Sequence, residues 1–272
     1  MIDFHKPLES VIRARRRGRP LLLFLDYDGT LVEIASRPAL ARPAPELIEL
    51  LSRLTARADL KVMVVSGRPL WELQEMLPVP GMGFLGSHGG EGFLSQCLRP
   101  QQVIAAEKNE LLHWRSRLEA RLQSFLGWWI EDKPLGFALH YRQLSKEYLH
   151  EFIVIIEKWQ QQVRLEKRFQ LLAGKKVLEI MPQGVSKGAA IQEILSLPAF
   201  SGYFPIYLGD DITDESAFHL LQGRGLTIKV GRSGSKTAAS HFLLNPEEVR
   251  RFLTALAFLL EDHDGEYFRS SG

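Results

Sequence analysis

The chain lacks most of the features that mark secreted, membrane-bound or nucleic-acid-binding proteins. Its single cysteine, Cys97, excludes an internal disulfide and suits a reducing compartment. No apolar run approaches the roughly 20 residues that a membrane helix needs, and the run after basic residues 13–17 is too short for a signal peptide. The formal net charge of +2 does not indicate a nucleic-acid or acidic partner. We therefore expect a cytoplasmic, monomeric protein that binds neither a membrane nor nucleic acid.

The sequence also has no internal repeat and no low-complexity tract. Hydrophobic residues make up 45% of its 272 residues, which is enough for a full core in one large domain or two smaller ones. Short apolar runs alternate with segments of helical spacing, a pattern typical of a doubly wound parallel α/β sheet. The predicted strands are 21–25, 60–65, 84–85, 205–208 and 226–230, and the predicted helices are 45–55, 69–77, 186–195, 214–221 and 247–260.

The middle of the chain does not follow this alternation. Two long amphipathic helices are predicted at 107–126 and 146–162, with strands at 136–141 and 176–180. This arrangement favours a small α+β domain inserted into the sheet domain. We therefore predict a catalytic core made of residues 1–95 and 183–272 and an inserted domain of residues 96–182.

The first predicted strand ends in two aspartates, Asp26 and Asp28, followed by glycine and Thr30. An apolar run of this kind is typical of a strand buried on both faces, and open α/β sheets bind ligands at the carboxyl ends of such strands. Two carboxylates there are costly unless they bind a cation or take part in chemistry. One carboxylate can attack phosphorus while the other gives and takes a proton.

Three further segments carry polar residues at predicted strand ends or helix starts. Ser66 ends the second strand, Lys187 opens a helix, and Asp210 follows the strand at 205–208. Hydroxyls and a lysine can neutralise a phosphoryl group, and the helix start favours anions. Carboxylates such as Asp26 and Asp210 suit Mg²⁺, with Asp211 and Asp214 placed to complete or orient its ligand shell. Each segment alone is a weak signal, and the strength lies in their combination and order.

These four segments resemble the four motifs of the haloacid dehalogenase superfamily, whose phosphatases use an aspartate nucleophile. Further segments extend the match: Ser87-His88-Gly-Gly-Glu91, Phe137-Ala-Leu-His140-Tyr-Arg142, Lys176-Val-Leu-Glu179-Ile, Ser186-Lys187-Gly and Gly209-Asp-Asp-Ile-Thr-Asp-Glu215. Together these segments, covering about residues 20 to 255, are similar to the trehalose-6-phosphate phosphatases. Tyr27 is a small departure, because some relatives carry leucine or phenylalanine there.

The resemblance implies a role for each matched residue. Asp26 would form an aspartyl-phosphate, and Asp28 would protonate the leaving sugar oxygen and later activate water. Mg²⁺ would be held by Asp26, the backbone carbonyl of Asp28, and Asp210. Thr30, Ser66 and Lys187 would bind the phosphoryl group, whereas Asp211 and Asp214 would support the metal and the lysine. The inserted domain would be a cap that closes over the sugar.

The expected substrate is trehalose 6-phosphate, and a synthase for it is the expected metabolic neighbour. Side chains that can hydrogen-bond to hydroxyl groups would bind the sugar, the charged ones through charge-assisted hydrogen bonds. The candidates are His88, Glu91, Lys133, His140, Arg142, Lys176 and Glu179.

Other functions remain open on the sequence alone. The substrate could instead be a phosphate of sucrose, glucosylglycerol or mannosylglycerate, because pocket shape decides this and the sequence does not show it. A non-catalytic sugar-phosphate sensor is disfavoured, since a binder has no use for a nucleophile and a proton donor. A phospho-accepting signalling receiver would carry its aspartate after a later strand and would need no cap.

Overall fold

The computed structural model describes residues 5–35, 37–94, 97–100, 105–174, 176–232 and 236–269. Its contacts divide the chain into two compact units. The first comprises Met1–Arg99 and Ser186–Gly272, and the second, Pro100–Val185, is inserted between these two parts in the sequence. The first is an α/β unit with a mostly parallel sheet, and the second is an α+β unit with its own antiparallel sheet. The predicted fold class is therefore confirmed.

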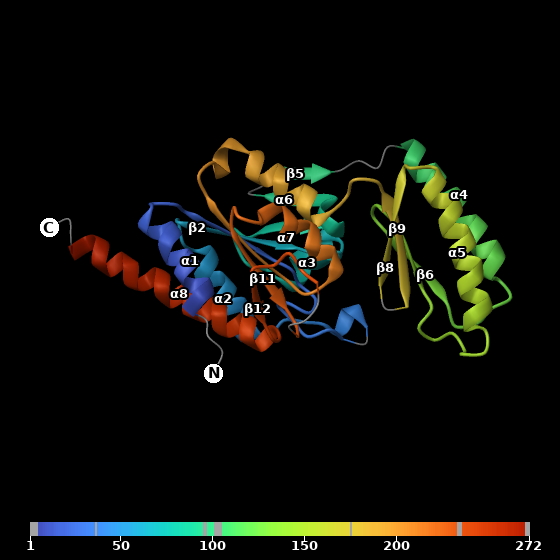
Figure 1. The fold of residues 1–272 in the computed structure, drawn as a ribbon, viewed down its shortest axis with the longest axis horizontal. Coiled ribbons are helices and arrows are strands. Elements are labelled where there is room, and N and C mark those ends of the chain that lie inside the picture. Colours follow the sequence, from blue (N-terminus) through green and yellow to red (C-terminus); the bar gives the residue numbers. More distant parts are fainter. Residues whose placement is uncertain are drawn as a thin grey trace. The chain divides into compact units, whose positions relative to one another are not determined.

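The first unit is built on an eight-stranded sheet (Figure 1). Its strands are β1 (Leu21–Leu25), β2 (Leu60–Val65), β3 (Gly83–Gly86), β4 (Glu91–Leu94), β5 (Cys97–Pro100), β10 (Phe204–Gly209), β11 (Leu226–Val230) and β12 (His241–Leu243). They lie in the order β12-β11-β10-β1-β2-β3-β4-β5. The pairs from β12 to β3 are parallel, and β4 pairs with β3 in the antiparallel direction. Strand β1 thus lies between β10 and β2.

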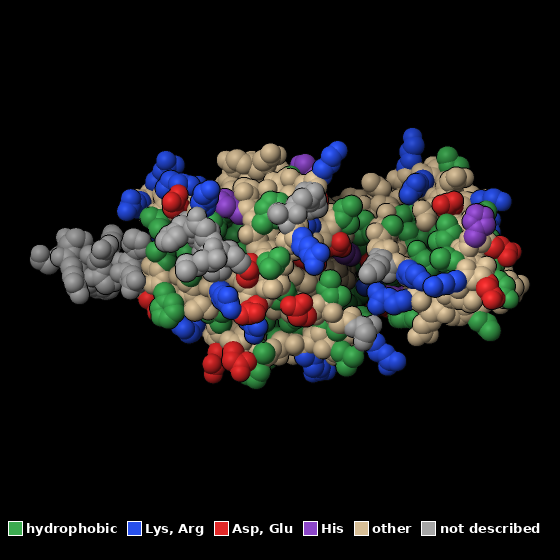
Figure 2. Space-filling view, turned by 60° about the horizontal axis from the view of Figure 1, so that its bottom comes forward, with side chains coloured by type: hydrophobic (Ala, Val, Ile, Leu, Met, Phe, Trp, Pro, Cys, Tyr) green, Lys and Arg blue, Asp and Glu red, His purple; other side chains and the backbone are tan. Residues whose placement is uncertain are grey.

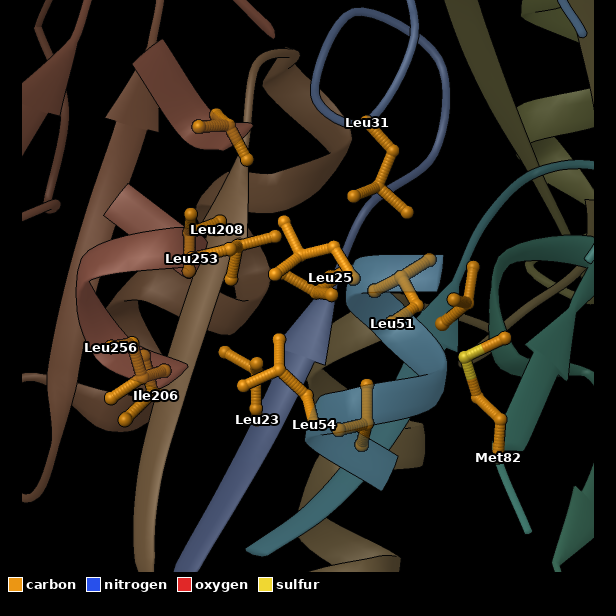
Figure 3. Close-up of a cluster of buried hydrophobic side chains, with 14 of the residues drawn as sticks. Leu23, Leu25, Leu31, Leu51, Leu54, Met82, Ile206, Leu208, Leu253 and Leu256 are labelled. Atoms are coloured by element: carbon orange, nitrogen blue, oxygen red, sulfur yellow. The ribbon is translucent and has the colours of Figure 1, made fainter. Parts of the chain in front are cut away.

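Helices cover both faces of this sheet, which is why β1 is apolar at every position. Its odd-numbered leucines pack against one group of helices, and Leu22 and Phe24 pack against the other. Figure 3 shows Leu23 and Leu25 among leucines of the first group. That group comprises α1 (His5–Arg16), α2 (Pro45–Thr55), α3 (Leu70–Met76) and α8 (Pro246–Arg269), and the other comprises α6 (Lys187–Ser196) and α7 (Glu215–Leu221).

The second unit has a four-stranded antiparallel sheet with two helices on one face. Its elements are α4 (Ala105–Leu122), β6 (Trp129–Lys133), β7 (Gly136–His140), α5 (Leu149–Leu165), β8 (Phe169–Gly174) and β9 (Val177–Pro182). The sheet order is β6-β7-β9-β8. Phe137 and Leu139 of β7 pack with Trp159 of α5 in the hydrophobic core of this unit. Because side chains alternate along a strand, their neighbours lie on the opposite face.

Several elements differ from the predictions. Strands β6 and β8 are not predicted, and the predicted strand at 176–180 starts one residue later, because Lys176 has a φ of 62° in the turn before β9. Four short 3₁₀ helices complete the described structure: η1 (Pro38–Leu40), η2 (Ser87–Gly89), η3 (Pro198–Phe200) and η4 (Ile212–Asp214).

Two features of the described residues bear on membrane and nucleic-acid binding. Among the described helices, none combines the length and the apolar character that crossing a membrane requires. Acidic and basic side chains are interspersed over the face that Figure 2 shows.

Candidate active site

Loops that follow β1, β2 and β10 carry the predicted catalytic side chains. Asp26 directly follows β1, and its N–H donates to the carbonyl of Leu208 at 2.9 Å. Ser66 directly follows β2, and its N–H donates to the carbonyl of Leu85 at 2.9 Å. Asp210 directly follows β10. Because these three strands are parallel neighbours, their carboxyl ends meet at one edge of the sheet.

Lys187 reaches the same edge from the first turn of α6. Ser186 starts this helix, because its hydroxyl accepts a hydrogen bond from the N–H of Ala189 at 3.1 Å. The ammonium of Lys187 donates to Oδ1 of Asp26 at 2.6 Å and to Oδ1 of Asp214 at 2.7 Å. The lysine and both carboxylates are buried. A lysine held between two carboxylates offsets part of the cost of burying all three charges.

Both carboxylate oxygens of Asp214 are engaged by neighbouring groups. Oδ1 also accepts from the hydroxyl of Tyr207 at 2.5 Å, and Oδ2 accepts from the N–H of Asp211 at 2.8 Å. A Cβ at Gly209 would lie 2.3 Å from Cγ of Asp214, so only glycine allows this approach. Asp214 therefore orients Lys187 and closes the loop after β10.

The cluster holds more negative charge than its lysine can balance. Burial would lower the pKa of Lys187, but Asp214 and Asp26 raise it above its ordinary value, so the ammonium stays charged. Burial raises the pKa of Asp26 to about 7, although Lys187 opposes this. Burial and then the charges of Asp26 and Asp214 raise the pKa of Asp210 to about 9. Asp210 has no cationic partner among the described residues, so we place the retained proton there rather than on Asp26.

This charge excess fits a divalent cation. Asp26, Asp210 and Asp214 offer ligand atoms that lie within 4.8 Å of one another. Since Asp214 is already engaged, Asp26 and Asp210 are the carboxylates that fit a cation. Gly29, with a φ of +79°, brings the backbone after β1 against this pair, and a Cβ on it would lie 2.2 Å from Oδ2 of Asp210. Hard oxygen ligands of this kind suit Mg²⁺. The predicted ligation by the Asp28 carbonyl stays a prediction.

The carboxylate of Asp28 forms a two-pronged ion pair with Arg68. Nε of Arg68 donates to Oδ2 at 2.7 Å, and Nη2 donates to Oδ1 at 2.8 Å. Ser66 is buried, and its hydroxyl accepts from the N–H of Arg68 at 3.2 Å. Thr30 is fully buried, and its hydroxyl has no hydrogen-bond partner within the described part of the chain. Phosphate binding by Thr30 and Ser66 stays a prediction.

His88 and Glu91, predicted to bind sugar, lie in and after the turn of η2. Ser87 and His88 have φ angles of 48° and 58°, in the left-handed region that is strained for residues with a Cβ. A Cβ on Gly67 would lie 2.6 Å from the ring of His88, so that glycine makes room for the imidazole. Oε2 of Glu91 accepts from the hydroxyl of Ser87 at 2.6 Å and from the N–H of Leu70 at 3.1 Å. Glu91 thus stabilises this turn through hydrogen bonds within the first unit. Its contact with the sugar stays a prediction.

The second unit brings other predicted sugar-binding residues together on the face of its sheet opposite the helices. Nζ of Lys133 lies 3.7 Å from Oε1 of Glu131 and 3.9 Å from Oε2 of Glu179. The other oxygen of Glu131 lies 2.8 Å from Nε2 of His140. The half-exposed ring of Trp129 stacks on His140, with 4.0 Å between ring centroids and 6° between planes. This polar face therefore combines two carboxylates, a lysine and a stacked ring pair.

Two predicted sugar-binding residues lie just beyond this face. Arg142 is exposed after β7, and Lys176 occupies the turn before β9, where its carbonyl accepts from the N–H of Tyr141 at 3.1 Å. Two residues with marked contacts were not among the sequence candidates. Arg68 lies in the segment Ser66-Gly67-Arg68, whose composition is typical of a turn, and Glu131 lies on a strand that was not predicted. Once residues 129–133 are known to form a strand, alternation places Glu131 and Lys133 on the same face.

Comparisons with known proteins agree with this arrangement. A family model described as trehalose-phosphatase matches residues 24–247. Trehalose 6-phosphate phosphatase RA3 of Zea mays is 31% identical over 264 residues, which are 90% of this chain and 72% of that protein. A trehalose-phosphate phosphatase of Mycobacterium tuberculosis is 33% identical over 253 residues, which cover 90% of this chain and 63% of that protein, so the chain spans less than two thirds of its length.

A solved structure leads to the same fold. The C-terminal domain of a C. albicans trehalose-6-phosphate phosphatase has a TM-score of 0.81 with this chain at 23% identity, covering 95% of this chain and 98% of that one. The predicted resemblance is therefore confirmed. Since the family model matches most of the chain and the Zea mays protein exceeds 30% identity, this chain belongs to the trehalose-phosphatase family of phosphoric monoester hydrolases.

Proposed function

We propose that this chain is a Mg²⁺-dependent phosphatase that hydrolyses trehalose 6-phosphate to trehalose and inorganic phosphate through an aspartyl-phosphate on Asp26. The contact of Asp26 with Lys187, at 2.6 Å beside the central strand of the sheet, is the observation that carries this proposal. Lys187 engages Oδ1 of the buried carboxylate, which leaves Oδ2 as the oxygen for attack on phosphorus.

The reaction then has two displacements. In the first, Oδ2 of Asp26 forms a bond to phosphorus, the bond from phosphorus to the sugar oxygen breaks, and Asp28 gives its proton to that oxygen. In the second, a water oxygen attacks phosphorus, Asp28 takes a proton from the water, and the bond between phosphorus and Asp26 breaks. The two steps together restore the carboxylate of Asp26 and the proton on Asp28, so Asp28 acts first as an acid and then as a base.

Positive charge and hydrogen-bond donors at the sheet edge stabilise the transferring phosphoryl group. Lys187 is fixed by Asp26 and Asp214, so it is preorganised for this task. Ser66 and Thr30 contribute a hydroxyl each. Asp26 and Asp210 would hold a Mg²⁺ ion, which would supply positive charge to the phosphoryl group.

We assign the second unit as the cap that recognises the sugar. Its polar sheet face offers Glu131, Lys133 and Glu179 for charge-assisted hydrogen bonds to hydroxyl groups. His140 adds an imidazole that is held by Glu131, and Trp129 adds a half-exposed aromatic surface. Such a face suits a neutral sugar, because hydroxyl groups can donate to the carboxylates and accept from the lysine.

Phosphate release from the purified chain tests this function. Trehalose 6-phosphate, sucrose 6-phosphate, glucosylglycerol phosphate and glucose 6-phosphate are each supplied with Mg²⁺ or with EDTA. We expect metal-dependent turnover that is much faster on trehalose 6-phosphate, and no turnover by Asp26→Asn. A Glu131→Gln variant should raise KM for the disaccharide ester while leaving turnover of a small aryl phosphate unchanged.

Each alternative has its own outcome in this assay. A preference for another ester would keep the mechanism and replace the substrate. Saturable binding of a sugar phosphate without turnover, by folded protein with Mg²⁺ present, would favour a sugar-phosphate sensor. Retained activity in Asp26→Asn would refute the assigned nucleophile.

A further inference from the structure

Arg68 is a buried arginine next to the catalytic cluster that the reaction described above leaves without a function. It lies in the loop after β2, and its guanidinium meets the carboxylate of Asp28 with two parallel hydrogen bonds of 2.7 and 2.8 Å. The side chain of Arg68 is 6% exposed, whereas that of Asp28 is 38% exposed. The carboxylate is therefore held from its buried side and open on the other.

The guanidinium itself is fixed by further contacts. Nη2 also donates to the carbonyl of Pro38 at 2.8 Å, and Nη1 contacts the carboxylate of Glu72. The ring of Tyr27 lies 5.1 Å from the guanidinium carbon, within cation–π range. Because these three contacts fix its guanidinium, Arg68 can hold the carboxylate of Asp28 in one orientation.

The two hydrogen bonds from Arg68 occupy both carboxylate oxygens of Asp28. An ionised carboxylate can accept both bonds from Arg68, whereas a protonated one has one oxygen occupied as a donor. The orientation in the structure is therefore that of the base, which takes the proton from water when the phosphorylated enzyme is hydrolysed.

We propose that Arg68 is a positioning residue for this second step, holding ionised Asp28 where it can deprotonate the water that attacks phospho-Asp26. This inference rests on the proposed function. In the step, a water oxygen bonds to phosphorus, the bond to the Asp26 oxygen breaks, and the water proton passes to Asp28. Arg68 takes no part in the bond changes.

The test separates the two steps kinetically. The value of kcat/KM reports events up to release of the sugar, and the hydrolysis step contributes only to kcat. In Arg68→Gln and Arg68→Lys we expect kcat to fall by about 10²-fold, as misplacement of a catalytic group does. We expect kcat/KM to fall far less, so that KM falls too. Rapid mixing should then show a burst of sugar release, and acid quenching should trap the phosphorylated protein.

Lysine keeps the charge but cannot form the two-pronged contact, so Arg68→Lys should still show the burst. It also serves as the readout if glutamine at this buried position prevents folding. The matched control is Arg57→Gln, because Arg57 makes the same two-pronged contact with Asp59, at 3.0 and 3.2 Å, without a place in the reaction. This control should keep wild-type kcat, KM and burst behaviour.

The outcomes distinguish this inference from the proposed function. Equal losses of kcat and kcat/KM without a burst, or unchanged kinetics in both Arg68 variants, would overturn the positioning role. Wild-type protein that neither turns over a phosphate ester nor forms a phosphorylated species would overturn the proposed function itself.

Discussion

Magnesium binding to this chain should release a proton, because a carboxylate that would hold the ion is protonated at neutral pH in the metal-free protein. Burial and the neighbouring carboxylates raise the pKa of Asp210 to about 9, and burial raises that of Asp26 to about 7. A cation binds the ionised oxygens, so each displaced proton makes the apparent affinity rise about tenfold per pH unit. We expect the Mg²⁺ dissociation constant to fall about tenfold per unit from pH 7 to 9, and more steeply below pH 7.

The same shifts set the sign of the effect on stability. Between about pH 4 and 9, the metal-free folded chain keeps protons on these carboxylates that the unfolded chain has released. The contribution of this cluster to the free energy of unfolding therefore decreases as pH rises through that window. Bound Mg²⁺ would offset both causes of the loss, the burial of the charged carboxylates and their mutual repulsion. The gain in Tm on adding Mg²⁺ should consequently widen from pH 6 to pH 9.

Calorimetric titration with Mg²⁺ in two buffers of different ionisation enthalpy measures the released protons directly. At pH 7.5 we expect about one proton per ion, because Asp210 is almost fully protonated there. Asp210→Asn should weaken binding and abolish most of this release. Asp59→Asn is the control, since Asp59 pairs with Arg15 and Arg57 outside the cluster. A dissociation constant that is independent of pH, with no proton release, would refute this account of the charge balance.

Three further substitutions test other parts of the structure. Gly29→Ala should weaken Mg²⁺ binding in the same titration and cost about 1–2 kcal/mol of stability, because a Cβ at φ +79° is strained and meets Asp210; wild-type affinity would contradict this. Tyr27→Phe removes a 2.8 Å bond to the carbonyl of Ala41 and should lower the free energy of unfolding in urea by about 1–2 kcal/mol. Leu139→Ala leaves a cavity in the core of the second unit and should cost about 2–5 kcal/mol, so a loss below 1 kcal/mol would show that this core is not packed as described.

The grouping of the predicted site residues at one edge of the sheet could be predicted, because each signal is local and the strands pair in parallel. Asp26, Ser66 and Asp210 each follow an apolar run that is recognisable as a buried strand. Parallel pairing of neighbouring strands then brings residues that are far apart in sequence to one edge. Lys187 needed only the recognition of a helix start.

Arg68 could not be assigned in this way. Its partner Asp28 is 40 residues earlier, and no periodic pattern links them. The segment Ser66-Gly67-Arg68 has the composition of a turn. The positioning role that we propose for Arg68 depends on its guanidinium pointing inward to the carboxylate of Asp28, which lies in another loop. Only the packing of the loop after β2 against the turn that follows β1 determines that direction.

Strand β6 escaped prediction for a different reason. Trp129 and Ile130 favour extended backbone, but Glu131, Asp132 and Lys133 have low strand propensity, so the segment alone gives only a weak strand signal. Pairing with β7 provides the missing stabilisation, since Ile130 lies opposite Leu139 and packs against the core of the second unit. The charged residues that weaken the local signal are the ones that make the polar face.

The first unit buries carboxylates beside its apolar core, and apolar packing cannot offset their excess negative charge. Strand β1 and its neighbours bury Asp26 with Asp214, and Asp210 lies partly buried beside them, yet one lysine balances at most one of the three charges. A protein selected for stability alone would replace such a cluster with apolar residues, because buried ion pairs rarely stabilise a fold. A proton relieves this excess, and so would the divalent cation of the proposed function. These two states place positive charge on the same oxygens. Each should therefore oppose the other, so loss of Mg²⁺ and a fall in pH should both favour the protonated cluster.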